Sequence, residues 1–161
     1  MNLYPAQTDA SGRRFAIVVS RFNEFLTAKL LDACVETLTS RGALSDEIDA
    51  VWVPGAFEIP QAASILAASG RYDAVVALGA VIRGETPHFD YVCDAVTDGI
   101  REIIRETGVP VAFGILTTGD RQQALARAGG EVGNKGIEAA EAAIEMAGIR
   151  ARLSKPPEAP R

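Results

Sequence analysis

Residues 74–90 read AVVALGAVIRGETPHFD, and this segment combines the three kinds of structure from which the whole chain is built. The apolar run at 74–82 predicts a strand buried on both faces, which is typical of a parallel sheet covered by helices. A polar loop with Gly84 and Pro87 follows, and a helical pattern of apolar residues begins at His88. Pro87 suits the first turn of a helix, where its missing N–H would have had no partner. The segment therefore predicts a strand, a loop and a helix in direct succession.

The same succession recurs on both sides of this segment. Apolar runs at 15–20, 48–54 and 109–116 predict three more buried strands. Helices are expected at 24–41 with Asn23 as the N-cap, from about 57 to 69, from 88 to about 107, at 121–128, and from 134 to about 147. The alternation predicts an α/β protein, a single-domain three-layer α/β/α sandwich. Because crossovers between parallel strands are right-handed, we expect a four-stranded parallel sheet in the flavodoxin-like order 2-1-3-4.

The chain has 161 residues, which is enough for one domain with its own core. We expect a polar N-terminal arm at 1–14, outside the core, and an α/β domain at 15–149. A proline-rich, polar segment at 150–161 predicts a flexible C-terminal tail. The glycine-rich residues 129–133 are expected to link the last two helices.

Composition and charge restrict the possible partners. The chain contains 16 basic and 21 acidic residues, and its formal net charge is -5. An acidic chain without a basic run argues against nucleic acid as the main partner, but one or two well-placed arginines suffice for a small anion. The apolar runs are shorter than the roughly 18 to 20 residues that cross a membrane, and the first residues lack the apolar core of a signal peptide. We therefore expect a cytoplasmic protein that does not bind membranes.

The cysteines and the glycines argue against several kinds of cofactor site. Cys34 and Cys93 have no CxxC spacing and lie in helical patterns, so we expect buried free thiols in a reducing compartment. They have too few companions for a zinc site. The pattern GxxxxGK(S/T) is absent, and GxGxxG does not follow the first strand, which disfavours nucleotide and dinucleotide binding.

In a parallel sheet, the loops that follow the strands share one edge, where open α/β sheets bind their ligands. Aromatic residues recur in these loops and suggest a slot for a flat ring. The backbone groups of Ala56 and of residues 80–82 are suited to bind the polar edge of such a ring. Asn23 and Glu58 are candidates to bind hydroxyl groups. The residues concerned are Phe22, Asn23, Ala56, Phe57, Glu58, Ala80, Val81, Ile82 and Phe113. Taken singly, each of the three phenylalanines is more typical of an ordinary core residue.

The loop before His88 has the features of an anion site beside one titratable group. Free N–H groups at a helix start, next to Gly84 and Thr86, are suited to an anion. His88 is the only histidine of the chain, and an imidazole exchanges protons near neutral pH. The alternatives are an ordinary turn and a surface or capping histidine. Arg127 and Lys135 flank the glycine-rich link and are suited to face an anion, although solvated surface charges show the same pattern.

Five blocks of the sequence resemble the lumazine synthase family of riboflavin synthesis. They occur in order and at matching spacing, and they are RFN at 21–23, PGAFEIP at 54–60, GAVIRG at 79–84, TPHFD at 86–90 and GNKG at 133–136. The similarity runs from about residue 15 to 148. It implies a transferase that condenses 5-amino-6-(D-ribitylamino)uracil with 3,4-dihydroxy-2-butanone 4-phosphate. The implied products are 6,7-dimethyl-8-ribityllumazine, phosphate and water, and the implied reaction needs no metal or organic cofactor.

The resemblance also implies a role for each matching residue. Phe22 stacks on the pyrimidine, and His88 is the acid–base residue. A carboxylate at Glu85, in the phosphate-binding segment, is unusual for the family and electrostatically unfavourable beside an anion. Ala56, Phe57, Glu58, Ala80, Val81, Ile82 and Phe113 line the pyrimidine pocket, Asn23, Glu58 and Lys135 lie near polar or ribityl groups, and Glu85, Thr86 and Arg127 hold the phosphate.

Members of the family assemble as pentamers or multiples of pentamers with active sites at subunit interfaces. The resemblance implies that Phe113, Arg127 and Lys135 reach the site from the neighbouring subunit. Two other functions remain as alternatives. One is a riboflavin or lumazine carrier that has lost catalysis, against which the intact His88 and Arg127 argue. The other is a flavodoxin-like electron carrier, which is disfavoured because the loop after the first strand lacks a Ser/Thr-rich character.

Overall fold

A sheet of four parallel strands forms the centre of the protein. In the computed structural model, which describes residues 1 and 3–154, the strands are β1 (Phe15–Ser20), β2 (Ile48–Val53), β3 (Ala74–Ile82) and β4 (Val111–Thr118). Their order is β2-β1-β3-β4, and every neighbouring pair is parallel. The predicted strand order is confirmed, and β1 and β3 have the predicted bounds.

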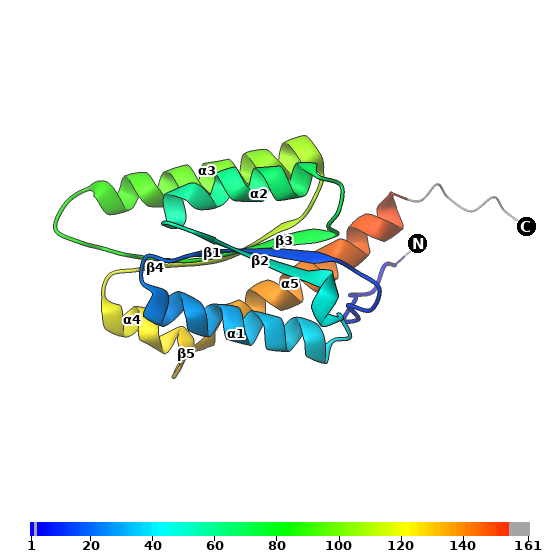
Figure 1. Ribbon diagram of the computed structural model, residues 1–161, viewed down its shortest axis with the longest axis horizontal. Coiled ribbons are helices and arrows are strands. Elements are labelled where there is room, and N and C mark those ends of the chain that lie inside the picture. Colours follow the sequence, from blue (N-terminus) through cyan, green and yellow to red (C-terminus); the bar gives the residue numbers. More distant parts are fainter. Residues whose placement is uncertain (2, 155–161) are drawn as a thin grey trace, which may run out of the picture.

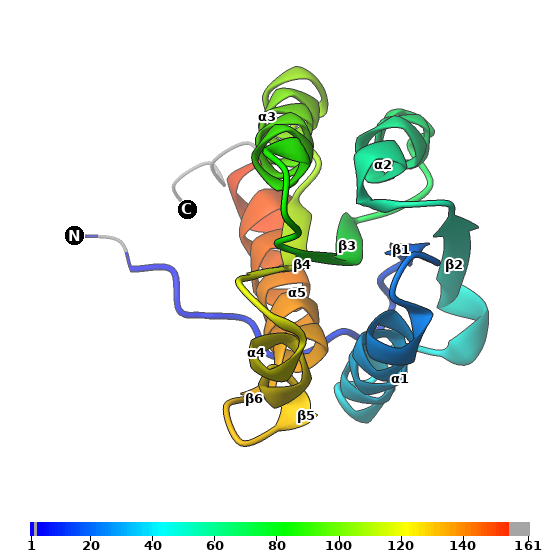
Figure 2. The same cartoon turned by 90° about the vertical axis from the view of Figure 1, so that its left-hand side faces the viewer.

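Helices cover both faces of this sheet (Figure 1, Figure 2). Helices α1 (Glu24–Ser40), α4 (Arg121–Ala126) and α5 (Lys135–Leu153) lie on one face, and α2 (Ile59–Ala68) and α3 (His88–Thr107) lie on the other. In β1, Ile17 and Val19 pack into the core beneath α1 and α5, whereas Ala16 and Val18 pack into the core beneath α2 and α3. Both faces are therefore apolar, which explains why the sequence shows continuous runs. The predicted three-layer arrangement is confirmed.

The ends of several elements differ from the prediction. β4 begins at Val111 and not at 109, because Pro110 has no N–H for the ladder and only its carbonyl takes part, accepting from the Val75 N–H at 2.9 Å. The strand then continues to Thr118, two residues beyond the predicted end at 116. Two 3-10 turns were not predicted, η1 (Ser45–Glu47) before β2 and η2 (Ala56–Glu58) before α2.

The predicted glycine-rich link forms a small antiparallel hairpin, β5 (Ala128–Gly130) and β6 (Gly133–Asn134). Its contact with α4 requires a glycine at position 130, where an added Cβ would lie 2.7 Å from the carbonyl oxygen of Leu125. The Oδ1 of Asn134 accepts a hydrogen bond from the Gly136 N–H at 2.8 Å and caps α5. The last helix therefore starts directly after the hairpin.

The N-terminal segment and the end of α5 lie side by side (Figure 1). Ala10 is fully buried and its N–H donates to the Arg41 carbonyl at 2.8 Å, so part of the predicted arm belongs to the core. Helix α5 continues to Leu153, beyond the predicted end at 147, and Gly148 leaves room for the side chain of Gln7. Residues 150–153 are thus helical and not the start of a tail, while 155–161 lie outside the described residues.

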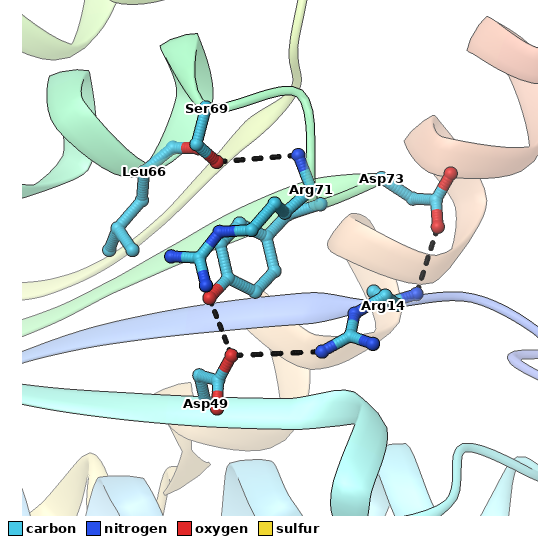
Figure 3. A network of polar contacts seen from close by, with 7 residues as sticks. Arg14, Asp49, Leu66, Ser69, Arg71 and Asp73 are labelled. Atoms are coloured by element: carbon cyan, nitrogen blue, oxygen red, sulfur yellow. Dashed lines mark hydrogen bonds and ion pairs between the residues drawn. The ribbon is translucent and has the colours of Figure 1, made fainter.

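Polar residues at the amino-terminal edge of the sheet bond to one another (Figure 3). The Tyr72 hydroxyl donates to Asp49 Oδ2 at 2.5 Å, and the Arg14 guanidinium lies 4.0 Å from the same oxygen. The Arg14 N–H donates to Asp73 Oδ2 at 2.8 Å, and the Asp73 N–H donates to the Arg14 carbonyl at 2.8 Å. Burial, together with the hydrogen bond to Asp49, raises the pKa of Tyr72. This network joins the starts of β1, β2 and β3.

Candidate active site

A cavity of about 660 Å³ opens at the carboxyl edge of the sheet, beside the ends of β1, β2 and β3 and the first turn of α3. This edge faces the viewer in Figure 2. Phe22 and Phe57 line the cavity while remaining 70% and 61% exposed, so their rings are accessible to a ligand. Nine of the predicted site residues share this one cavity: Phe22, Ala56, Phe57, Glu58, Ala80, Val81, Ile82, Thr86 and His88.

Within the described residues, backbone groups at the end of β3 are left without a partner strand on the side that faces β1. Its ladder with β1 stops at Leu78, whereas its ladder with β4 continues to Ile82. The Arg83 N–H donates to the Thr118 carbonyl, on the β4 side, at 2.9 Å. Since successive residues of a strand direct their N–H and C=O groups to opposite sides, those of Ala80 and Ile82 point away from β4, to the side where the β1 ladder has ended.

Asn23 occupies the N-cap position of α1, as predicted, but its side chain makes no capping hydrogen bond and is used at the end of β3 instead. Its Nδ2 donates to the Ala80 carbonyl at 3.0 Å. The backbone is left-handed, with φ 63°, and among the described residues every other positive φ belongs to a glycine. Asparagine adopts this conformation more readily than most residues. The start of α1 is closed instead by the Asn23 carbonyl, which accepts from the Leu26 N–H at 2.8 Å. The side chain therefore ties the loop after β1 to the end of β3.

Glu58 combines a structural contact with a place on the cavity wall. Its Oε2 accepts a hydrogen bond from the Gly55 N–H at 2.9 Å and closes the turn η2. A carboxylate has acceptor sites on both oxygens. Because Glu58 also lines the cavity, its Oε1 is suited to accept a hydrogen bond from a ligand hydroxyl.

His88 is the first residue of α3 and combines an exposed side chain with a place in the cavity lining. Thr86 lines the cavity with it, whereas Glu85 is exposed and lies outside the lining. Pro87, predicted in the first turn, occupies the N-cap position, and its carbonyl accepts from the Asp90 N–H at 3.0 Å. The start of a long helix, one hydroxyl and one imidazole are thus grouped at one side of the cavity.

Sequence reasoning missed two residues of α3 that line the cavity, Phe89 and Val92. The signal for Val92 was present, because it follows His88 by one helical turn and therefore lies on the same side of the helix. Arg83 was also missed. Its guanidinium donates two hydrogen bonds to Asp90, at 3.1 and 2.6 Å, and lies 4.2 Å from the centre of the Phe89 ring. These hydrogen bonds lower the pKa of Asp90 and raise that of Arg83.

Three predicted site residues lie away from this cavity. Phe113 is in the middle of β4, not in the loop after it, and lines a separate hollow of about 420 Å³ with residues of α3. Arg127 follows α4 and donates from Nη1 to the Gln123 carbonyl at 3.1 Å. Lys135 begins α5, where its Nζ lies 2.5 Å from Glu138 Oε2. Within one chain, these three residues do not join the others.

The remaining reactive groups do not form a second site. Cys34 is buried, and this burial raises the pKa of its thiol to about 12. Cys93, predicted to be buried, is only half-buried, and partial burial raises its pKa as well. Over residues 1 and 3–154, no three His, Cys, Asp or Glu side chains are grouped so as to hold a metal ion, and no helix is long and apolar enough to cross a membrane.

The sequence of the chain matches the family model of 6,7-dimethyl-8-ribityllumazine synthase over residues 12–151. The matched segment contains the whole sheet and every residue that lines the cavity. The resemblance drawn from five short blocks is thereby confirmed over nearly the full length. The chain belongs to the 6,7-dimethyl-8-ribityllumazine synthase family, whose members are transferases of riboflavin synthesis.

Proposed function

We propose that the protein condenses 5-amino-6-(D-ribitylamino)uracil with 3,4-dihydroxy-2-butanone 4-phosphate to form 6,7-dimethyl-8-ribityllumazine, phosphate and water. The observation that carries this proposal is the cavity at the carboxyl edge, which combines two exposed aromatic rings with the only histidine of the chain. A flat ring with a polar edge fits such a site, because the aromatic faces stack while backbone groups form hydrogen bonds. The family match supports riboflavin synthesis as the setting.

We assign the pyrimidine to the face of Phe22. This ring is 70% exposed, so stacking would remove apolar surface from water without displacing a core residue. Backbone groups of Ile82 and Ala56 are suited to the polar edge of the pyrimidine. The ribityl hydroxyls are assigned to Asn23 Oδ1 and Glu58 Oε1, because Nδ2 of Asn23 and Oε2 of Glu58 already have partners. Phe57, Ala80 and Val81 complete the wall.

We assign the phosphate group to the loop at 84–87 and the start of α3. A helix of 20 residues presents free N–H groups at its first turn, next to this loop. Thr86 offers a hydroxyl on the cavity wall. Glu85 is exposed and outside the lining, so its proposed contact is through the backbone N–H, with its carboxylate in solvent. Arg127 is proposed to supply the positive charge.

His88 is the proposed acid–base group. The amine of one substrate attacks the ketone of the other, so the protein does not have to supply a nucleophile. Imine formation, loss of phosphate and ring closure each move protons, which an imidazole at the cavity is suited to accept and donate. Holding the two substrates together contributes a further part of the rate. The proposed reaction requires neither a metal nor an organic cofactor.

We also propose that the protein is a homo-oligomer, a pentamer or a multiple of pentamers, with each site completed by a neighbouring chain. Phe113 is 41% exposed on the edge strand β4, and neither Arg127 nor Lys135 reaches the cavity of its own chain. These positions support a shared site. Chains carrying His88→Ala and chains carrying Arg127→Ala, refolded together, should regain activity, because some sites then combine an intact His88 with an intact Arg127.

Refolded wild-type protein is the control for this mixing experiment, and each variant refolded alone sets the baseline. Activity of the mixture equal to the average of the two baselines would contradict a site shared between chains. Sedimentation analysis of the wild-type protein measures the oligomer directly, and a monomer at the concentration of the assay would exclude the proposed assembly.

The proposed reaction is tested by turnover of the two substrates in the presence of a chelator. Lumazine absorbance and released phosphate are followed together, and we expect equal amounts of both products. Binding of the pyrimidine without turnover would indicate the carrier alternative. Neither binding nor turnover would contradict the proposed function while leaving the fold unaffected.

A further inference from the structure

The loop at 84–87 has few bonds of its own, although the proposed function assigns the phosphate to it. All of its residues are exposed, and an added Cβ at Gly84 would meet nothing within 4 Å. Across the part of the chain that the structure describes, the side chains of Glu85, Thr86 and His88 have no hydrogen-bond partner. The position of this loop is therefore determined by the contacts at its two ends.

Arg83 joins these two ends. Its backbone N–H donates to the Thr118 carbonyl at 2.9 Å, which fixes the residue to the end of β4. Its guanidinium donates from Nη1 and Nη2 to the two carboxylate oxygens of Asp90, at 3.1 and 2.6 Å, across the whole loop. The same guanidinium lies over the ring of Phe89, 4.2 Å from its centre. Three contacts thus hold Arg83 in place, one through its backbone and two through its side chain.

This arrangement differs from an ordinary surface ion pair, which contributes little because both side chains lose freedom in water. A bidentate pair between arginine and a carboxylate fixes the geometry of both groups, and stacking on an aromatic ring adds a third restraint. Neither Arg83 nor Asp90 lines the cavity, whereas Phe89 and His88 do. The pair therefore acts on the cavity through the residues beside it.

We propose that Arg83 and Asp90 are positioning residues, whose bidentate pair against Phe89 holds the loop at 84–87 and His88 in the geometry that binds phosphate and transfers protons. The proposal rests on the proposed function. It requires both members equally, because the loss of either one breaks the bidentate pair and leaves at most the stacking of Arg83 on Phe89 across the loop. A direct role of Arg83 as a phosphate ligand would instead make Asp90 dispensable.

Hydrogen exchange tests the restraint without reference to activity. The backbone amides of Arg83, Asp90 and Tyr91, which donate hydrogen bonds at the two ends of the loop, are compared in the wild-type protein, Arg83→Gln and Asp90→Asn. Glu102→Gln is the control, because it removes one carboxylate from an exposed ion pair with Arg105 on the same helix. We expect exchange about tenfold faster in both variants of the pair and unchanged in the control. Unchanged exchange in Asp90→Asn would overturn the proposal, whether or not the protein turns over the proposed substrates.

Steady-state kinetics then test the consequence for the reaction. We expect Arg83→Gln and Asp90→Asn to lower kcat by a similar factor, of about 10 to 100, at an unchanged Tm. The double variant should be no worse than either single one, because each change breaks the same pair. An exchanged pair, Arg83→Asp with Asp90→Arg, should recover part of the loss.

A different kinetic result would overturn the positioning role. If Arg83→Gln raised only the KM for the butanone phosphate and Asp90→Asn were normal, Arg83 would be a direct ligand. If the wild-type protein showed no turnover at all, the proposed function would fail, and hydrogen exchange would still decide whether the pair restrains the loop. The two failures are therefore distinguishable.

Discussion

The two edges of the sheet contain polar residues with different surroundings. At the amino-terminal edge, Tyr72, Asp49, Arg14 and Asp73 bond to one another and join the starts of three strands (Figure 3). At the carboxyl edge, His88 and the aromatic rings beside it border an open cavity and are exposed. Exposed apolar surface of this kind marks binding sites. The difference separates polar residues that connect strands from polar residues that are free to bind a ligand.

The largest effect on function is expected from His88→Ala at the carboxyl edge. Loss of an acid–base group should lower kcat by about 10²- to 10⁴-fold, while turnover stays above the uncatalysed reaction because both substrates are still held together. Tm should not change, since the side chain is exposed. Steady-state kinetics and a thermal melt measure both quantities. A folded variant without any turnover would show that the acid–base role is larger than we propose.

Arg127→Ala should act on one substrate only. Removal of a charged hydrogen-bond donor is expected to raise the KM for the butanone phosphate by about 10- to 100-fold and to leave the KM for the pyrimidine unchanged. Arg121→Ala is the matched control, because Arg121 begins the helix that Arg127 follows and stacks on Phe25, 4.2 Å from its ring centre. Equal KM values in Arg127→Ala and in the wild-type protein would exclude the assignment of Arg127 to the phosphate.

Asp49→Ala should have the opposite effect, on stability and not on activity. It removes the acceptor of the Tyr72 hydroxyl in a partly buried hydrogen bond, which costs about 1 kcal/mol of unfolding free energy. The kcat should stay at the wild-type value, because the residue lies at the other edge of the sheet. Tyr72→Phe should cost less, since it removes both the donor and the need for its partner. A large loss of kcat in stable Asp49→Ala protein would remove the distinction between the two edges.

The buried Cys34 offers a pH-dependent test away from both edges. Burial raises its pKa from 9.0 to about 12, so between these values the unfolded chain loses the thiol proton and the folded chain keeps it. Its contribution to stability is therefore complete below pH 9.0 and is lost as the pH rises toward 12, by up to about 1.4 kcal/mol per pH unit. The free energy of unfolding, measured with urea at several pH values, should fall more steeply with pH in the wild-type protein than in Cys34→Ala. Parallel pH profiles would contradict it.

Sequence patterns predicted the fold well because the strands are buried on both faces. The runs at 15–20 and 74–82 have no polar interruption, so their bounds were clear, and the order of the strands brings their loops to one edge. The residues around Phe22, Phe57 and His88 could therefore be expected to meet. Their roles, the cytoplasmic location and the oligomer stay predictions.

Contacts between distant residues were not predictable from local rules. Asn23 has the right type and position for an N-cap, but its side chain instead donates a hydrogen bond to the carbonyl of Ala80, a residue distant in the sequence. The pair of Arg83 and Asp90 spans a loop whose path no local pattern specifies. Phe113 was grouped with the strand-end loops although it falls within the run predicted as the fourth strand, and the structure places it inside β4.

The central claim is that the cavity at the carboxyl edge is the site of the reaction, and a crystal structure with bound 6,7-dimethyl-8-ribityllumazine tests it most directly. We predict that the ring system stacks on Phe22, that the ribityl chain extends toward Asn23 and Glu58, and that His88 lies within hydrogen-bonding reach of the ligand. A product molecule bound away from this cavity, with Phe22 free of any contact, would contradict the account.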